Sequence, residues 1–156
     1  MKVAEPSTPD EFKHYYELRW KILRAPWNQP RGSEQDELEK TSCHMMVIDK
    51  NTIIAVGRLQ LDSTCEARIR YMAVDISQQH KGVGTLLLNA LEQRAVELGA
   101  ERIVLDAREN ALGFYRKHGY KQESPGHILF NAINHITMTK SFDSWSGYPP
   151  ESCHCW

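Results

Sequence analysis

The chain has no run of about 18 apolar residues, the length that a membrane-spanning helix requires. Its first residues, Met1 to Pro6, lack the apolar segment of a secretory signal peptide. Its four cysteines lack the even spacing of a disulfide framework, because Cys43 and Cys65 are isolated and the other two lie within the last four residues. These three absences favour a cytoplasmic location.

A strong net charge is missing as well. The chain has 19 Lys and Arg residues against 20 Asp and Glu residues, a formal net charge of −1. This balance does not attract nucleic acid or an anionic membrane, so an anionic ligand would need a local binding site. The other proportions are ordinary. The chain has 156 residues, 41% hydrophobic and 25% charged, which is typical of one soluble globular domain and excludes a disordered or collagen-like chain.

Sequence periodicity predicts both helices and strands. Thr8-Pro9-Asp10-Glu11 has the cap, proline and glutamate of a helix start, and helical spacing of apolar residues continues to about Arg24. Apolar positions from Val83 to Leu98 also recur every three or four residues, and Gly99 is expected to stop that helix. We expect two further short helices, over 33–40 and 111–118, and strands over 2–5, 44–49, 52–61, 67–75, 102–105, 120–123 and 133–139.

The order of these elements predicts the fold class. Antiparallel hairpins are combined with strand–helix–strand crossovers, which indicates an α/β (α+β) fold with helices on both faces of a central sheet. Residues 141–156 show no periodicity, so we expect a single domain over 1–140 followed by an irregular tail. Cys153, His154 and Cys155 in that tail are too close together for a closed zinc site, so we expect no metal and free thiols there.

The strongest local signal is the segment Gln79–Thr85, which lies between a predicted strand and a predicted amphipathic helix. Its glycines let the backbone approach a ligand closely, and the N–H groups and dipole of a helix start favour an anion. A Walker loop is absent, and a dinucleotide-binding fingerprint fails because Leu87 occupies the third glycine position. The pattern that fits is Gln/Arg-x-x-Gly-x-Gly/Ala, with a plain glycine turn as the alternative reading.

Three segments, in this order and at these spacings, resemble the acetyl-CoA-binding core of the GNAT N-acyltransferases. They are Arg70–Asp75, Gln79–Gly84 and Asn110–Tyr120, and the resemblance extends over roughly Tyr15 to Lys140. It implies the GNAT fold, a mixed and mostly antiparallel twisted sheet with helices on both faces. A finer similarity, to the ElaA-like branch, rests on Leu18, Arg19, His44, His135, Ile136 and Met138.

The resemblance also implies roles for single residues. Asn110 would hydrogen-bond the cofactor arm, or else only cap a helix. Tyr115 would contact the cofactor near the thioester sulfur and serve as general acid, or else be a core aromatic beside Phe114. Backbone groups would hold the pantetheine arm at Met72, Ala73 and Val74 and the pyrophosphate at Gln79, His80, Lys81, Gly82, Val83, Gly84 and Thr85.

The general base has several candidates. An attacking amine must lose a proton, and histidine titrates near neutral pH, so His44 and His135 are chemically suitable. Each could instead be a structural histidine. Glu34 and Glu39 are further candidates. The acidic run 34–37 would attract a cationic amine if it borders the cleft, or would form a solvated helix face.

The sequence therefore predicts an acetyl-CoA-dependent N-acetyltransferase. An acetyl group would pass from acetyl-CoA, as cosubstrate, to an amine by direct attack in a ternary complex. The alternative is a CoA-binding sensor or interaction module with little turnover. The expected partners are acetyl-CoA and an amine on a small molecule or a protein, without nucleic acid or membrane, and a homodimer is left open.

Overall fold

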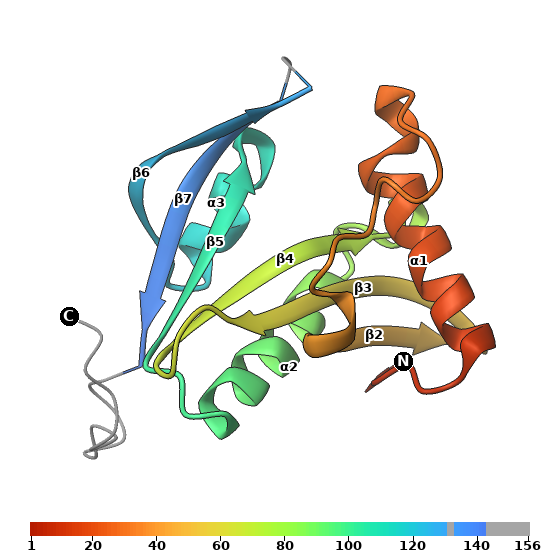
Figure 1. Ribbon diagram of the computed structural model, residues 1–156, viewed down its shortest axis with the longest axis horizontal. Helices are drawn as coiled ribbons and strands as arrows, with labels where there is room; N and C mark the ends of the chain where they lie inside the picture. Colours follow the sequence, from red (N-terminus) through yellow and green to blue (C-terminus); the bar gives the residue numbers. More distant parts are fainter. Residues whose placement is uncertain (131–132, 143–156) are drawn as a thin grey trace. The chain divides into compact units, whose positions relative to one another are not determined.

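The computed structural model describes residues 1–130 and 133–142, except for the side chains of 124–128 (Figure 1). The described chain divides into two compact units. The first comprises Met1–Gln60 and Ile69–Arg94, and the second comprises Leu61–Arg68 and the described residues from Ala95 onward. Within this described part, no helix is long and apolar enough to span a membrane.

The first unit is an antiparallel sheet with a helix on each face. Val56 packs in the core with Tyr15 of the first helix, whereas the next residue, Gly57, faces the second helix. A Cβ added at Gly57 would lie 2.9 Å from Leu91 Cδ1, so a larger residue would force the Leu91 side chain to shift. The strands follow the order β1 (Lys2–Ala4), β2 (Cys43–Asp49), β3 (Thr52–Leu61) and β4 (Glu66–Val74), and the helices are α1 (Pro9–Leu23) and α2 (Val83–Glu97).

The ends of both long helices agree with the sequence. Thr8 Oγ1 accepts a hydrogen bond from the Glu11 N–H at 3.1 Å, and Glu11 Oε1 accepts one from the Thr8 N–H at 3.1 Å. This reciprocal capping box starts α1. Gly99 follows α2 with a φ of 90°, a backbone conformation that glycine adopts without a Cβ penalty.

The second unit contains the first residues of β4 and three further strands, which are neighbours in the order β5, β7, β6. Both pairs among β5, β6 and β7 are antiparallel, and Leu105 of β5 lies opposite Met138 of β7 in the buried layer. The elements are β5 (Arg102–Arg108), a 3₁₀ helix (Glu109–Ala111), α3 (Leu112–Lys117), β6 (Lys121–Leu129) and β7 (Ile133–Ser141).

A seven-stranded sheet with flanking helices confirms the predicted fold class. Several predictions were wrong in detail. Residues 33–40 do not form a helix but turns that lead into a 3₁₀ helix at Glu39–Thr41, because their carboxylates point inward to buried arginines. Cys65 is disulfide-bonded, although the cysteine spacing did not predict a disulfide framework, whereas Cys43 is a free thiol. Ser141 belongs to β7, and the rest of the predicted tail from residue 143, with its Cys-His-Cys segment, lies outside the described residues.

Candidate functional site

The predicted cofactor loop joins β4 to α2 in the first unit. Asp75 caps a short 3₁₀ helix by accepting a hydrogen bond from the Ser77 N–H at 3.0 Å. Gln79 Nε2 then donates to the Val74 carbonyl oxygen at 3.3 Å, which ties the loop to the end of β4. Two left-handed residues follow, His80 with a φ of 65° and Gly82 with a φ of 80°. The loop is therefore a defined turn rather than an extended connection.

The loop is exposed and leads directly into a helix start. Residues 79–82 are exposed, and an added Cβ at Gly82 would meet nothing within 4 Å. Glycine at this position is thus favoured by the backbone angle rather than by crowding. Val83 and Leu87 are fully buried and anchor the first turn of α2. The first N–H groups of a helix have no intrahelical acceptor, and the helix dipole favours an anion beside them.

The strand before the loop carries a conformational break at Tyr71. Its φ of 55° lies in the left-handed region, which is rare for a residue with a side chain inside a strand. The break directly precedes Met72, Ala73 and Val74, the residues predicted to hold the pantetheine arm. Ala73 is buried in the core, whereas Met72 and Val74 are only half-buried.

The remaining predicted residues lie in the second unit. Tyr115 of α3 is buried, its ring packs edge-on against Phe114 and Tyr120, and burial raises the pKa of its hydroxyl to about 12. Asn110 is exposed and is not a helix cap, because Ala111 occupies the N-cap of α3. His135 is buried on β7 opposite Arg108.

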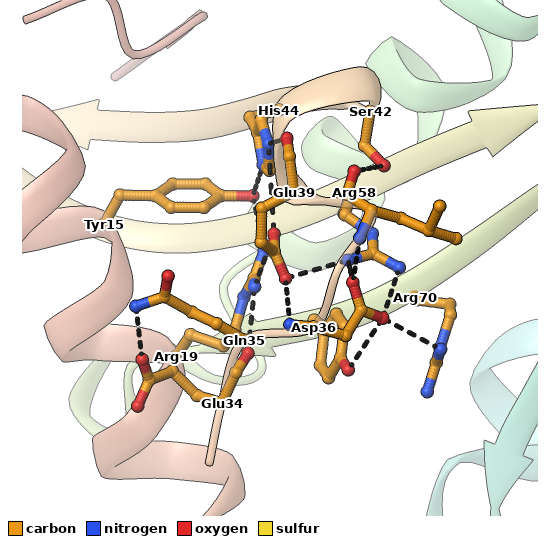
Figure 2. Close-up of polar contacts among 12 residues, drawn as sticks. Tyr15, Arg19, Glu34, Gln35, Asp36, Glu39, Ser42, His44, Arg58 and Arg70 are labelled. Atoms are coloured by element: carbon orange, nitrogen blue, oxygen red, sulfur yellow. Dashed lines mark hydrogen bonds and ion pairs between the residues drawn. The ribbon is translucent and has the colours of Figure 1, made fainter. Parts of the chain in front are cut away.

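His44 lies in the first unit with both ring nitrogens engaged (Figure 2). Nδ1 lies 2.9 Å from the Tyr15 hydroxyl, and Nε2 lies 2.7 Å from the Glu39 carbonyl oxygen. A carbonyl oxygen only accepts, so Nε2 carries a hydrogen and donates it. Burial lowers the pKa of His44, which favours the neutral ring. This geometry favours a structural role, because a general base needs an unoccupied nitrogen.

A pocket of about 460 Å³ lies beside His44. The stacked rings of Phe12 and Tyr16, with centroids 5.8 Å apart, line it, and Cys43 supplies a free thiol to it. No cluster of three or more metal-ligating side chains occurs in the described part of the chain. The other lining residues are Glu5, Pro6, Glu39, Lys40 and Ser42.

The sequence reading missed a buried ion-pair network. Arg19 of α1 and Arg58 of β3 are both fully buried, and Glu39 accepts a hydrogen bond from each, at 3.0 and 2.8 Å (Figure 2). Asp36 accepts two hydrogen bonds from Arg58, at 2.6 and 3.0 Å, and these hold its pKa at about 2. The sequence signal for this network is an arginine at a position where an apolar residue is expected. Arg19 lies on the apolar face of α1, and Arg58 lies inside the apolar run of β3.

The acidic run 34–37 therefore forms neither a solvated helix face nor a row of free carboxylates. Glu34 is buried, its Oε1 accepts from the Gly32 N–H at 2.8 Å, and its carbonyl oxygen accepts from Arg19. Glu34 and Glu39 were candidate bases, but both are occupied by donors within the first unit. Removing a proton from an amine would require breaking these bonds.

Comparison with known proteins agrees with this fold. Residues 12–120 match the Acetyltransferase (GNAT) family, and the chain belongs to that family. The chain is 31% identical over 140 residues to an uncharacterized N-acetyltransferase, YjcF, of Bacillus subtilis (strain 168). This alignment covers 90% of the chain and 99% of the relative. Family membership supports an N-acyltransferase activity.

Two solved structures share the fold. Escherichia coli ElaA has a TM-score of 0.75 at 16% identity, with 90% of this chain and 97% of that chain covered. An aminoglycoside 6'-N-acetyltransferase complexed with coenzyme A has a TM-score of 0.75 at 17% identity, with 90% and 97% covered. The predicted resemblance to the GNAT superfamily is thus confirmed, and the likeness to ElaA holds for the fold.

Proposed function

We propose that the protein transfers an acetyl group from acetyl-CoA to an amine nitrogen in a ternary complex. The observation that carries the proposal is the left-handed turn at His80 and Gly82, which leads into the N-terminus of α2. This arrangement offers backbone N–H groups and a helix dipole to a pyrophosphate. A relative of the same fold was solved with coenzyme A, which supports acyl-CoA as the cosubstrate.

The proposed reaction needs few chemical groups from the protein. The amine nitrogen attacks the thioester carbonyl carbon, the C–N bond forms, and the C–S bond breaks to release a thiolate. Binding both reactants in one site supplies much of the acceleration. The thiolate takes up a proton, for which we propose the Tyr115 hydroxyl, whose pKa of about 12 keeps it protonated at neutral pH.

The proposal assigns Asn110 to a hydrogen bond with the cofactor arm, since it is exposed and caps no helix. The base that deprotonates the amine is a separate question. The hydrogen bonds to both nitrogens weaken the case for His44, and His135 stays a candidate. The cytoplasmic location, the lack of nucleic-acid and membrane partners, and a homodimer likewise stay predictions.

Thiol release tests the activity directly. Purified protein is incubated with acetyl-CoA and a panel of small primary amines, peptides with a free N-terminus and lysine-containing peptides. An acetyltransferase releases CoA thiol with at least one acceptor, and mass spectrometry finds the acetylated amine. CoA binding without turnover on any acceptor would instead support the sensor alternative.

Substitution of Tyr115 tests the proposed acid. Tyr115→Phe keeps the ring and its packing, so acetyl-CoA affinity should change little. Turnover should fall roughly 10²-fold, the low end for general acid catalysis. Phe114→Leu, in the same helix, is the control for a packing change without loss of a hydroxyl. Full turnover in Tyr115→Phe, with the chemical step rate-limiting, would show that the hydroxyl is not the acid.

A further inference from the structure

The left-handed backbone of Tyr71 must be held by its surroundings. A residue with a Cβ at a φ of 55° is disfavoured by contact between the Cβ and the carbonyl oxygen. Such a conformation persists only when neighbouring groups over-determine it. Tyr71 lies in the first unit, directly before Met72, and its side chain is half-buried. The question is which contacts hold it.

Four guanidinium groups surround the Tyr71 ring, and we call them the arginine cage. The Cζ atoms of Arg19 and Arg58 lie 4.5 and 4.8 Å from the ring centroid. Those of Arg70 and Arg24 lie at 4.8 and 5.7 Å. A cation over an aromatic face is attracted by the ring quadrupole, more strongly where water is excluded.

The hydrogen bonding of the arginines explains why they pack against the Tyr71 ring. Arg19 Nε and Arg58 Nε are buried and have no hydrogen-bond partner among the described residues. The Tyr71 face is therefore a favourable neighbour for both groups. Asp36 Oδ2 accepts hydrogen bonds from the Tyr71 hydroxyl and from Arg70, both at 3.3 Å, so the same carboxylate links the ring and the cage.

We propose that the arginine cage holds Tyr71 in the left-handed conformation and so positions the Met72 backbone for the pantetheine arm of the cofactor. Tyr71 is thus a positioning residue, and the inference rests on the proposed function. Without the cage, a residue with a Cβ would relax to an ordinary strand conformation. The apparent cofactor affinity would then fall in proportion to the fraction of molecules that keep the binding conformation.

The test compares Tyr71 variants by calorimetric titration with CoA. Tyr71→Phe keeps the ring and should bind within about twofold of the wild type. Tyr71→Ala loses the ring but keeps a Cβ, so its Kd should rise roughly 10-fold. Tyr71→Gly also loses the ring, but glycine visits positive φ about as readily as negative φ, so its Kd should rise only about twofold.

A matched control is Lys50→Ala, because Lys50 has a φ of 50° in the exposed turn between β2 and β3. It should leave CoA affinity unchanged. The order of the glycine and alanine variants is decisive, since a plain packing role predicts that Tyr71→Gly is at least as harmful as Tyr71→Ala. If Tyr71→Ala does not fold, Tyr71→Leu replaces it, and binding equal to Tyr71→Phe would overturn the proposal.

Urea unfolding gives a second readout that needs no cofactor. A protein with glycine inside a strand is normally less stable than the same protein with alanine there. Here the Tyr71→Gly variant should be at least as stable as the Tyr71→Ala variant. A wild type that binds no CoA would refute the proposed function and this role in it together. A wild type that binds CoA, with Tyr71→Gly and Tyr71→Ala equally weakened, would refute only the cage proposal.

Discussion

Two loops of the first unit, residues 79–85 and 33–42, use their polar groups in opposite ways. The first exposes Gln79 to Gly82 and presents backbone N–H groups at the start of α2. The second turns Asp36 and Glu39 inward against fully buried arginines. The first loop relies on backbone groups that a short stretch of sequence provides. The second relies on side chains that folding brings together from distant positions in the sequence.

The two loops also differ in what their loss should change. Residues 79–82 of the first loop are exposed, so damage there should affect ligand binding more than folding. Loop 33–42 completes the charge balance of the core, because Arg19 and Arg58 have no exposure to water. Damage there should first affect the free energy of unfolding.

Replacing Arg58 with methionine should have the largest effect on stability. The substitution leaves Asp36 and Glu39 with one cation fewer in a partly or fully buried site. Removing one partner of a buried ion pair costs about 3–5 kcal/mol of unfolding free energy. Urea denaturation measures the change. Arg31→Met is the matched control, since Arg31 pairs with Glu17 on the surface, and its midpoint should stay near the wild-type value.

A loss below about 1 kcal/mol in Arg58→Met would show that water reaches the network and that the two loops differ less than the structure indicates.

The acid stability of loop 33–42 should depend on Asp36. Hydrogen bonds from Arg58 lower its pKa from 3.8 to about 2, so the folded protein binds the proton less readily than the unfolded chain. Its contribution is complete above about pH 4 and is lost as the pH falls towards 2. After allowance for solvent screening we expect about 1 kcal/mol. The wild type should lose stability in this window, and Asp36→Asn should lose less.

The smallest expected effect concerns His44 at higher pH. Burial, together with the positive charges of Arg19 and Arg58, lowers its pKa below the usual 6.5. The unfolded state then binds more protons than the folded state, so stability should fall as the pH drops below about 6.5. His44→Gln should flatten this slope between pH 7.5 and 5.5. An unchanged slope would mean that the ring accepts its proton in the fold.

Elements that depend on local chemistry were predictable from the sequence. The capping box at Thr8 and Glu11 and the stop at Gly99 need only neighbouring residues, and both are confirmed. The same holds for Gly82, because its φ of 80° lies in the left-handed region that favours glycine wherever it occurs. The hairpin of β2 and β3 was likewise predictable from two strand-like segments that flank a turn at residues 49–52, and it is confirmed.

Elements that depend on distant partners were not predictable. The predicted helix over 33–40 assumed that its carboxylates face water, but Arg58 lies more than 15 residues away in sequence. The predicted end of β5 at residue 105 was too early for a similar reason. Asp106 is polar, yet it accepts a hydrogen bond from Thr137 Oγ1 at 2.7 Å and continues the strand. Nothing in a local window indicates such pairs.

The most direct test of the account is CoA binding to Gly84→Asp, measured by titration calorimetry. An aspartate near the start of α2 complements the helix dipole, so folding should be preserved and circular dichroism can confirm it. Its charge would lie beside the pyrophosphate and should weaken binding roughly 10- to 10³-fold. Asn89→Asp, which adds the same charge on the exposed face of α2, should bind like the wild type. Wild-type affinity in a folded Gly84→Asp protein would contradict the assignment of loop 79–85 to the cofactor.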